Sequence, residues 1–114
     1  MKITIPIKLP SLNILLMKHW RALLSLKKKQ KSATHRAFNG KRLDIPPPPL
    51  IVTITRVGAK KLDVDDNLNG ACKYVRDQIA AEVGIDDGSD LYTWIYKQRK
   101  GDYSVEVEIE PRTW

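Results

Sequence analysis

The sequence predicts one α/β (α+β) domain, in which a four-stranded mixed sheet and two helices packed on it follow the order β-α-β-α-β-β. Three observations lead to this prediction. Four segments have the alternation or β-branched content of strands, two segments repeat apolar residues with helical spacing, and the two kinds are interleaved. The 114 residues also contain no internal repeat, and a chain of this length buries about two-thirds of its unfolded surface. We therefore expect residues 1–114 to form a single domain.

The first strand and the first helix are predicted in the N-terminal third of the chain. Residues 2–8 alternate as a half-buried strand does, and the outward position of Pro6 predicts an edge or irregular strand. A helix is predicted to begin at Pro10 and to end by Gly40. Prolines at residues 46–49 are expected to connect it to the next strand. Its predicted apolar face consists of residues spaced four apart, namely Leu12, Leu16, Trp20 and Leu24.

The rest of the chain predicts three strands and one helix. Residues 50–57 are rich in β-branched side chains, residues 91–97 have strand character, and residues 104–110 alternate cleanly. The turn residues at 100–102 predict a hairpin between the last two strands. The second helix is predicted to end at Gly84. Its buried face is expected to consist of Leu68, Cys72, Val75, Ile79 and Val83.

Positive charge is concentrated in the first 43 residues. The formal net charge is +7, and residues 1–43 contain eleven Lys or Arg and no Asp or Glu. Such a segment is typical of a surface that contacts a polyanion, either nucleic acid or an acidic membrane, although a solvated helix face has the same composition. We expect nine of the basic residues to contact DNA: Lys18, Arg21, Lys27, Lys28, Lys29, Lys31, Arg36, Lys41 and Arg42.

Cysteine content and hydropathy bear on the compartment. Cys72 is the only cysteine, so no internal disulfide is possible and a reducing compartment is expected. We expect Cys72 to be a small buried residue on a helix. The apolar run at residues 12–17 is too short to span a bilayer and lacks the layout of a signal peptide. The sequence thus predicts a cytoplasmic protein without a membrane partner.

Aspartates are clustered in two segments, which we call the first acidic segment (residues 63–67, Asp-Val-Asp-Asp-Asn) and the second acidic segment (residues 86–90, Asp-Asp-Gly-Ser-Asp). Two carboxylates about 4 Å apart repel by roughly 1 kcal/mol in water and by more in a drier site, and a divalent cation offsets that repulsion. An EF-hand beginning at Asp63 would need Gly and Glu where the chain has Leu68 and Tyr74. One cysteine and two separated histidines do not make a closed zinc site. Mg²⁺, or alternatively Mn²⁺, is the predicted cofactor, and no organic cofactor is expected.

Several side chains near these segments have two interpretations. Asp63 and Asp65 lie on one side of an extended segment, whereas Asp66 is either a metal ligand or an ordinary helix cap. Lys73 and Asp77 are spaced as a surface ion pair, but Lys73 is also placed to contact a scissile phosphate. Three aromatic residues on one face of the third strand are typical of a core or a dimer interface rather than of base stacking: Tyr92, Trp94 and Tyr96.

In combination, these residues resemble the RusA family of Holliday-junction resolvases, small nucleases common in phages and prophages. That family typically has Asp-x-Asp-Asn-Leu, then a helix with Lys and, four residues on, Asp, and then Asp-Asp at the following turn. The resemblance covers the N-terminus, where residues 9–13 resemble the family's Pro-Ser-x-Asn opening, and residues 50–110. The chain departs from the pattern at Val64, where the family has its first carboxylate, and at Lys73, which stands six residues after Asn67 rather than three. The matching residues, in order, are Asp65-Asp66-Asn67-Leu68, Lys73, Asp77 and Asp86-Asp87.

The resemblance implies a homodimer that cuts paired strands of branched DNA at acidic metal sites on a basic surface. We therefore expect a Mg²⁺-dependent, structure-selective endodeoxyribonuclease that resolves Holliday junctions or other branched DNA in recombination or repair. Asp66 and Asp87 are the expected metal ligands, Asp63 or Asp65 completes the set, and Lys73 contacts the phosphate. Two alternatives remain open: a catalytically inactive DNA-binding module with the same fold, and a metal-dependent nuclease that acts on RNA.

Overall fold

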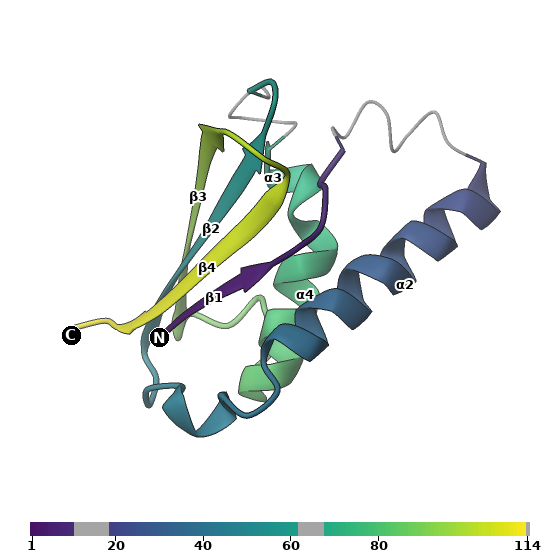
Figure 1. Cartoon of the computed structure of the whole chain (residues 1–114). Coiled ribbons are helices and arrows are strands. Elements are labelled where there is room, and N and C mark those ends of the chain that lie inside the picture. Colours follow the sequence, from purple (N-terminus) through teal and green to yellow (C-terminus); the bar gives the residue numbers. More distant parts are fainter. Residues whose placement is uncertain (11–18, 62–67, 114) are drawn as a thin grey trace.

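The computed structural model describes residues 1–10, 19–61 and 68–113, which form a sheet covered on one face by helices (Figure 1). The predicted order β-α-β-α-β-β is confirmed, with two short helical elements added. Along the described parts of the chain the elements are β1 (Lys2–Ile5), α2 (Trp20–Ala37), the 3₁₀ helix η1 (Arg42–Asp44), β2 (Leu50–Gly58), α3 (Asn69–Ala71), α4 (Lys73–Val83), β3 (Tyr92–Lys100) and β4 (Ser104–Pro111).

The sheet is mixed, as predicted, and its strand order is β1-β4-β2-β3. β2 pairs in parallel with β3 and antiparallel with β4, which also pairs antiparallel with β1. β1 is therefore an edge strand and ends at Ile5, immediately before Pro6. Proline has no N–H to donate to a neighbouring strand, so its effect on the first strand was read correctly from the sequence.

The predicted hairpin at residues 100–102 is wrong, because β3 and β4 lie on opposite sides of β2 and do not pair. Residues 101–103 instead cross the end of β2, where the N–H of Gly101 donates to the carbonyl of Gly58 at 3.1 Å. The turn residues correctly indicated a short connection. They do not reveal which strands become neighbours, and three residues are long enough to pass over one strand at the roughly 4.8 Å spacing of a sheet.

The second helix is buried as predicted, although it divides into α3 and α4. Leu68, Cys72, Val75 and Ile79 are all in the core between helix and sheet. α4 ends at Gly84, whose φ of 87° is left-handed and whose N–H donates to the carbonyl of Ala80 at 2.8 Å. Burial raises the pKa of the Cys72 thiol to about 12, even though Arg56 and Arg76 act in the opposite direction. Cys72 is thus a neutral packing residue, as the sequence predicted.

The predicted apolar face of the first helix is wrong in the part that the structure describes. Trp20 and Leu24 are 58 % and 55 % exposed, while residues 11–18, which include the predicted start of the helix, lie outside the described residues. Positions four apart rotate by about 40° around a helix with 3.6 residues per turn, so such a row winds off one face. Figure 1 shows the N-terminal half of α2 extending away from the sheet. Its C-terminal half buries Gln30, Ala33 and Thr34 instead.

A polar cluster joins α2 and η1 to α4. The Glu82 side chain, only 5 % exposed, accepts from Arg42 Nε at 2.8 Å and from Gln78 Nε2 at 3.1 Å, and it also contacts Nδ1 of His35. Burial raises the pKa of the Glu82 carboxyl, but the hydrogen bonds from Arg42, His35 and Gln78 outweigh burial and lower that pKa below its ordinary value. The cluster therefore stabilises the packing of α2 on α4 while Glu82 is ionised.

We predict that Glu82→Gln reduces the free energy of unfolding by about 1 kcal/mol at pH 7. Because the Glu82 pKa is lowered by folding, its contribution is complete above the unfolded value of about 4.3 and disappears as the pH falls through the folded value. Urea unfolding of both proteins between pH 7 and pH 3 measures this difference. Glu110→Gln, which alters an exposed acid at the end of β4, is the control. An equal loss of stability in both variants at pH 7 would contradict the prediction.

Candidate active site

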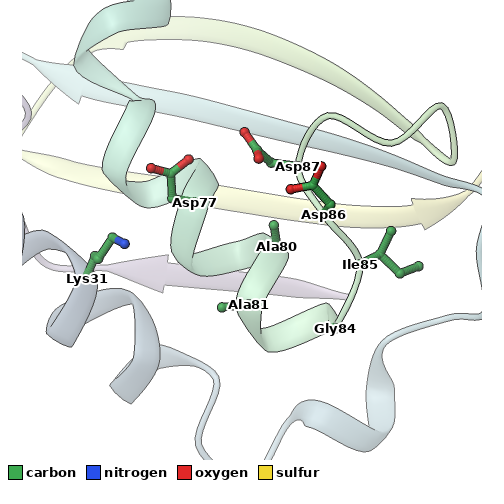
Figure 2. A pocket seen from close by; sticks show the side chains of 8 residues that line it. All are labelled: Lys31, Asp77, Ala80, Ala81, Gly84, Ile85, Asp86 and Asp87. Atoms are coloured by element: carbon green, nitrogen blue, oxygen red, sulfur yellow. The ribbon is translucent and has the colours of Figure 1, made fainter.

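The second acidic segment and α4 enclose an open cavity of about 460 Å³, which we call the acidic cavity. Asp77 of α4 and the neighbouring Asp86 and Asp87 line it together with Lys31 of α2. Figure 2 shows the side chains of Asp86 and Asp87 on the loop beyond Gly84 and that of Asp77 on the facing helix, with the Lys31 amino group on the α2 side. The fold thus brings together three carboxylates and one amine from three separate elements.

Aromatic residues of β3 hold the backbone of this loop. The Tyr92 hydroxyl donates to the carbonyl of Ile85 at 2.9 Å, and Trp94 Nε1 donates to the carbonyl of Asp87 at 2.9 Å. Their rings are 4.7 Å apart and pack against the core, as does Tyr96. Of the two interpretations left open by the sequence, the structure supports packing against the core, with Tyr92 buried and Trp94 and Tyr96 partly buried. The hydrogen bonds from β3 therefore fix the position of the loop relative to the sheet.

Asp87 also interacts with a cation that the sequence did not single out. Arg76 Nε lies 3.4 Å from Asp87 Oδ2, and Arg76 Nη1 donates to the Tyr96 hydroxyl at 3.0 Å. Burial lowers the pKa of Arg76, but the hydrogen bond to Tyr96 and the charges of Asp87 and Asp77 raise it above its ordinary value. The guanidinium therefore stays charged and interacts favourably with both Asp87 and Asp77. Arg76 directly precedes Asp77 in the sequence.

The electrostatic effect of the acidic residues extends to Tyr92. Its pKa is raised to about 12, first by burial and then by the negative charges of Asp87 and Asp86. Tyr92 consequently remains a neutral hydrogen-bond donor at physiological pH. The loop is therefore held by a hydrogen bond whose donor does not titrate near neutral pH.

Arg56 holds the backbone that leads into the first acidic segment. This buried residue of β2 donates from Nε to the carbonyl of Leu9 at 2.9 Å and from Nη1 to the carbonyl of Lys60 at 2.7 Å. It therefore fixes Lys60 relative to the chain after β1, two residues before position 62. A buried arginine within a strand that otherwise alternates apolar residues was a signal that the sequence offered and that reasoning from periodicity missed.

The structure places the remaining sequence-predicted site residues as follows. Asp63, Asp65 and Asp66 lie outside the described residues, as does Lys18. Lys73 is exposed in the first turn of α4, and among the residues that the structure describes it neither lines the acidic cavity nor forms an ion pair with Asp77. Lys31, predicted only as a DNA contact, lines the cavity instead. Asp77 and Asp86 join Asp87, although neither was assigned as a metal ligand.

The carboxylates of the acidic cavity are of the chemical type that Mg²⁺ and Mn²⁺ prefer, because both ions favour oxygen ligands. Within residues 1–10, 19–61 and 68–113, however, no group of three or more His, Cys, Asp or Glu side chains is arranged to hold a metal ion. A metal site at the acidic cavity would need ligands beyond the carboxylates that the structure describes there. Leu68, which directly follows the first acidic segment, is buried at the start of the helical region that contains Asp77.

Most of the predicted DNA contacts lie around α2 rather than on one of its faces. Lys27, Lys28 and Lys31 line a shallow depression with Leu24, whereas Lys29 and Arg36 line a different cavity on the other side. Neighbouring residues point about 100° apart on a helix, so a run of lysines surrounds it. The outlying contacts are Arg21, which stacks over Trp20, Lys41, which is exposed, and Arg42, which is paired with Glu82.

Comparisons of the chain with protein-family models, with curated protein sequences and with solved structures found no match. None of the helices in the described ranges is both long enough and apolar enough to cross a membrane.

Proposed function

We propose that the protein is a Mg²⁺-dependent, structure-selective endodeoxyribonuclease that cuts Holliday junctions or other branched DNA. The observation that supports it most is the gathering of Asp77, Asp86 and Asp87 in one open cavity directly beside the basic helix α2. Carboxylates suit a hard cation, and surrounding positive charge suits a phosphate backbone. The two features occur side by side, as chemistry on a phosphodiester requires.

In this proposal, Asp87 and Asp66 are metal ligands, and Asp63 or Asp65 completes the set. The bound cation would supply an activated water and neutralise charge on the phosphate. Lys31, across the cavity from the carboxylates, is positioned to contact a phosphate oxygen, and Lys73 remains a predicted contact one turn before Asp77 on α4. Arg76 positions Asp87 and limits repulsion while no cation is bound.

A DNA-binding module without cleavage is the second candidate. Its support is the ion pair of Arg76 with Asp87, in which a guanidinium occupies one side of the residue most needed as a metal ligand. The replacement of a family carboxylate by Val64 points the same way. In such a module, the basic helix would still contact phosphates, and the cavity would have a structural role only.

We predict that Asp87→Asn lowers the rate of nicking of a branched DNA by about 100-fold or more, because it removes a negative charge from the metal site while preserving side-chain size. Binding of the same DNA in EDTA should be unchanged or tighter. Asp66→Asn should have the same effect on nicking and on binding. Its fold should be preserved, since Asn still caps a helix. The measurement is nicking of branched, duplex and single-stranded DNA, and of a matched RNA, with and without Mg²⁺.

Asp90→Asn is the matched control, because Asp90 lies in the same segment but does not line the acidic cavity. Wild-type rates in Asp87→Asn would exclude this site. Binding without any Mg²⁺-dependent nicking by the wild-type protein would favour the non-cleaving module.

We predict that binding to DNA weakens steeply with salt and that replacing Lys27, Lys28, Lys29 and Lys31 with Ala makes the dependence shallower. Each phosphate contact contributes about −0.9 to the slope of log K against log salt concentration. Anisotropy titrations between 50 and about 300 mM salt measure the slope. An unchanged slope in the quadruple variant would place the DNA contact on another surface.

We also predict a homodimer with two-fold symmetry, since resolving a four-way junction requires two matched cuts and the described part of each chain offers one acidic cavity. The aromatic face of β3 is one candidate interface, although only Trp94 and Tyr96 remain partly exposed there, because Tyr92 is buried. Light scattering at micromolar concentration, with and without junction DNA, measures the mass. A monomer under both conditions would rule out paired cutting by a preformed dimer.

A further inference from the structure

A second cavity, which we call the Gln30 cavity, lies between α2 and the chain that follows β1. Its volume is about 610 Å³, within the range of roughly 300–1,000 Å³ typical of small-molecule sites. Proline and aliphatic side chains from residues 6–10 and from α2, including Leu26 and Ala33, form its walls. The described residues that line it include three cations and no acid, and the cations are Lys8, Lys29 and Arg36.

Gln30 distinguishes this cavity from an ordinary surface depression. The residue is only 1 % exposed, yet among the residues that the structure describes neither Nε2 nor Oε1 of its amide has a hydrogen-bond partner. Thr34 Oγ1 donates to the Gln30 main-chain carbonyl at 2.8 Å, so that contact leaves the side-chain amide unsatisfied. Folding disfavours a buried amide without partners, and Gln30 lines the cavity, which is where a partner can be supplied.

The chemistry around Gln30 fits a nucleotide. A carboxamide presents a donor and an acceptor side by side, which is the arrangement that matches the edge of a nucleobase. Apolar walls suit the faces of the base, and Lys8, Lys29 and Arg36 suit its phosphate. A simple anion site would need the cations alone. The amide and the apolar walls together fit a ligand that has a polar edge and flat apolar faces.

We propose that the Gln30 cavity binds one unpaired nucleotide of a DNA strand. The proposal rests on the proposed function, because the strand would be one that also passes the acidic cavity. α2 separates the two cavities: Lys31 lines the acidic one, and its neighbours Lys29 and Gln30 line the other. A strand crossing this helix has a basic path between them. Branched DNA offers nucleotides that are easily unpaired at the branch point, so the cavity would favour branched over continuous duplex DNA.

The test compares two single-stranded oligonucleotides of equal length, one with bases and one made of abasic residues, in EDTA so that no cleavage occurs. The wild-type protein should bind the base-containing strand about tenfold more tightly, as measured by anisotropy, because only that strand has a base to insert. Gln30→Leu should bind both strands with the affinity that the wild type has for the abasic one. Lys29→Gln should weaken binding of both strands more than Lys28→Gln, the same charge change one residue away from the cavity.

Stability separates a ligand site from a packing defect. Gln30→Leu removes an unpaired buried amide at nearly constant size, so its melting temperature should equal or exceed that of the wild type. Equal affinity of the wild type for both strands, or a base preference that survives in folded Gln30→Leu, would overturn the proposal. A free deoxynucleoside monophosphate that competes as well as the oligonucleotide would identify a site for free nucleotides and overturn the assignment to DNA.

The binding test gives a result whether or not the protein cleaves DNA, so the two proposals can fail separately. A base preference lost in Gln30→Leu, found together with an absence of Mg²⁺-dependent nicking, would overturn the proposed nuclease function and support the nucleotide site. If nicking requires Asp87 but the wild-type protein binds both strands equally, the nuclease function is supported and the nucleotide site is overturned.

Discussion

The parallel pairing of β2 with β3 is the constraint on which the rest of this structure depends. The pairing extends over nine residue pairs, from Leu50 opposite Tyr92 to Gly58 opposite Lys100. Parallel neighbours cannot be joined by a tight turn, so residues 59–91 must cross one face of the sheet and return to its starting end. α3 and α4 lie in this crossover, and the second acidic segment lies at its end. The acidic cavity exists because the returning chain has to pass α4 immediately before β3 begins.

The aromatic residues of β3 connect the core to the loop that lines the acidic cavity. Tyr92 and Trp94 pack against the core while their polar atoms hold the carbonyls of Ile85 and Asp87. Tyr96, one alternation further along β3, positions Arg76, which in turn contacts Asp87. A change in the packing of β3 therefore moves the carboxylates. Preorganisation of this kind is what a metal or phosphate site requires, since its ligands must be held before the substrate arrives.

Two features of the described residues do not favour the folded state. The amide of Gln30 is buried without a described partner, and Trp20 is exposed on the part of α2 that extends from the sheet. Natural sequences depart from what folding favours chiefly at functional sites. Both Gln30 and Trp20 lie on α2, the helix that also contributes Lys31 to the acidic cavity.

Local pattern determined much of this protein from the sequence alone. Alternation in β4, the apolar face from Leu68 to Ile79, the stop at Gly84 and the edge position imposed by Pro6 all depend on neighbouring residues, and all were read correctly. Only the tertiary structure decided that β2 separates β3 from β4, that Trp20 and Leu24 are exposed, and that Lys31 and Arg76 reach the second acidic segment. These outcomes depend on which surfaces remain uncovered after the chain packs. Residue spacing along one element holds no information about distances between elements, so the make-up of the acidic cavity had to come from the fold.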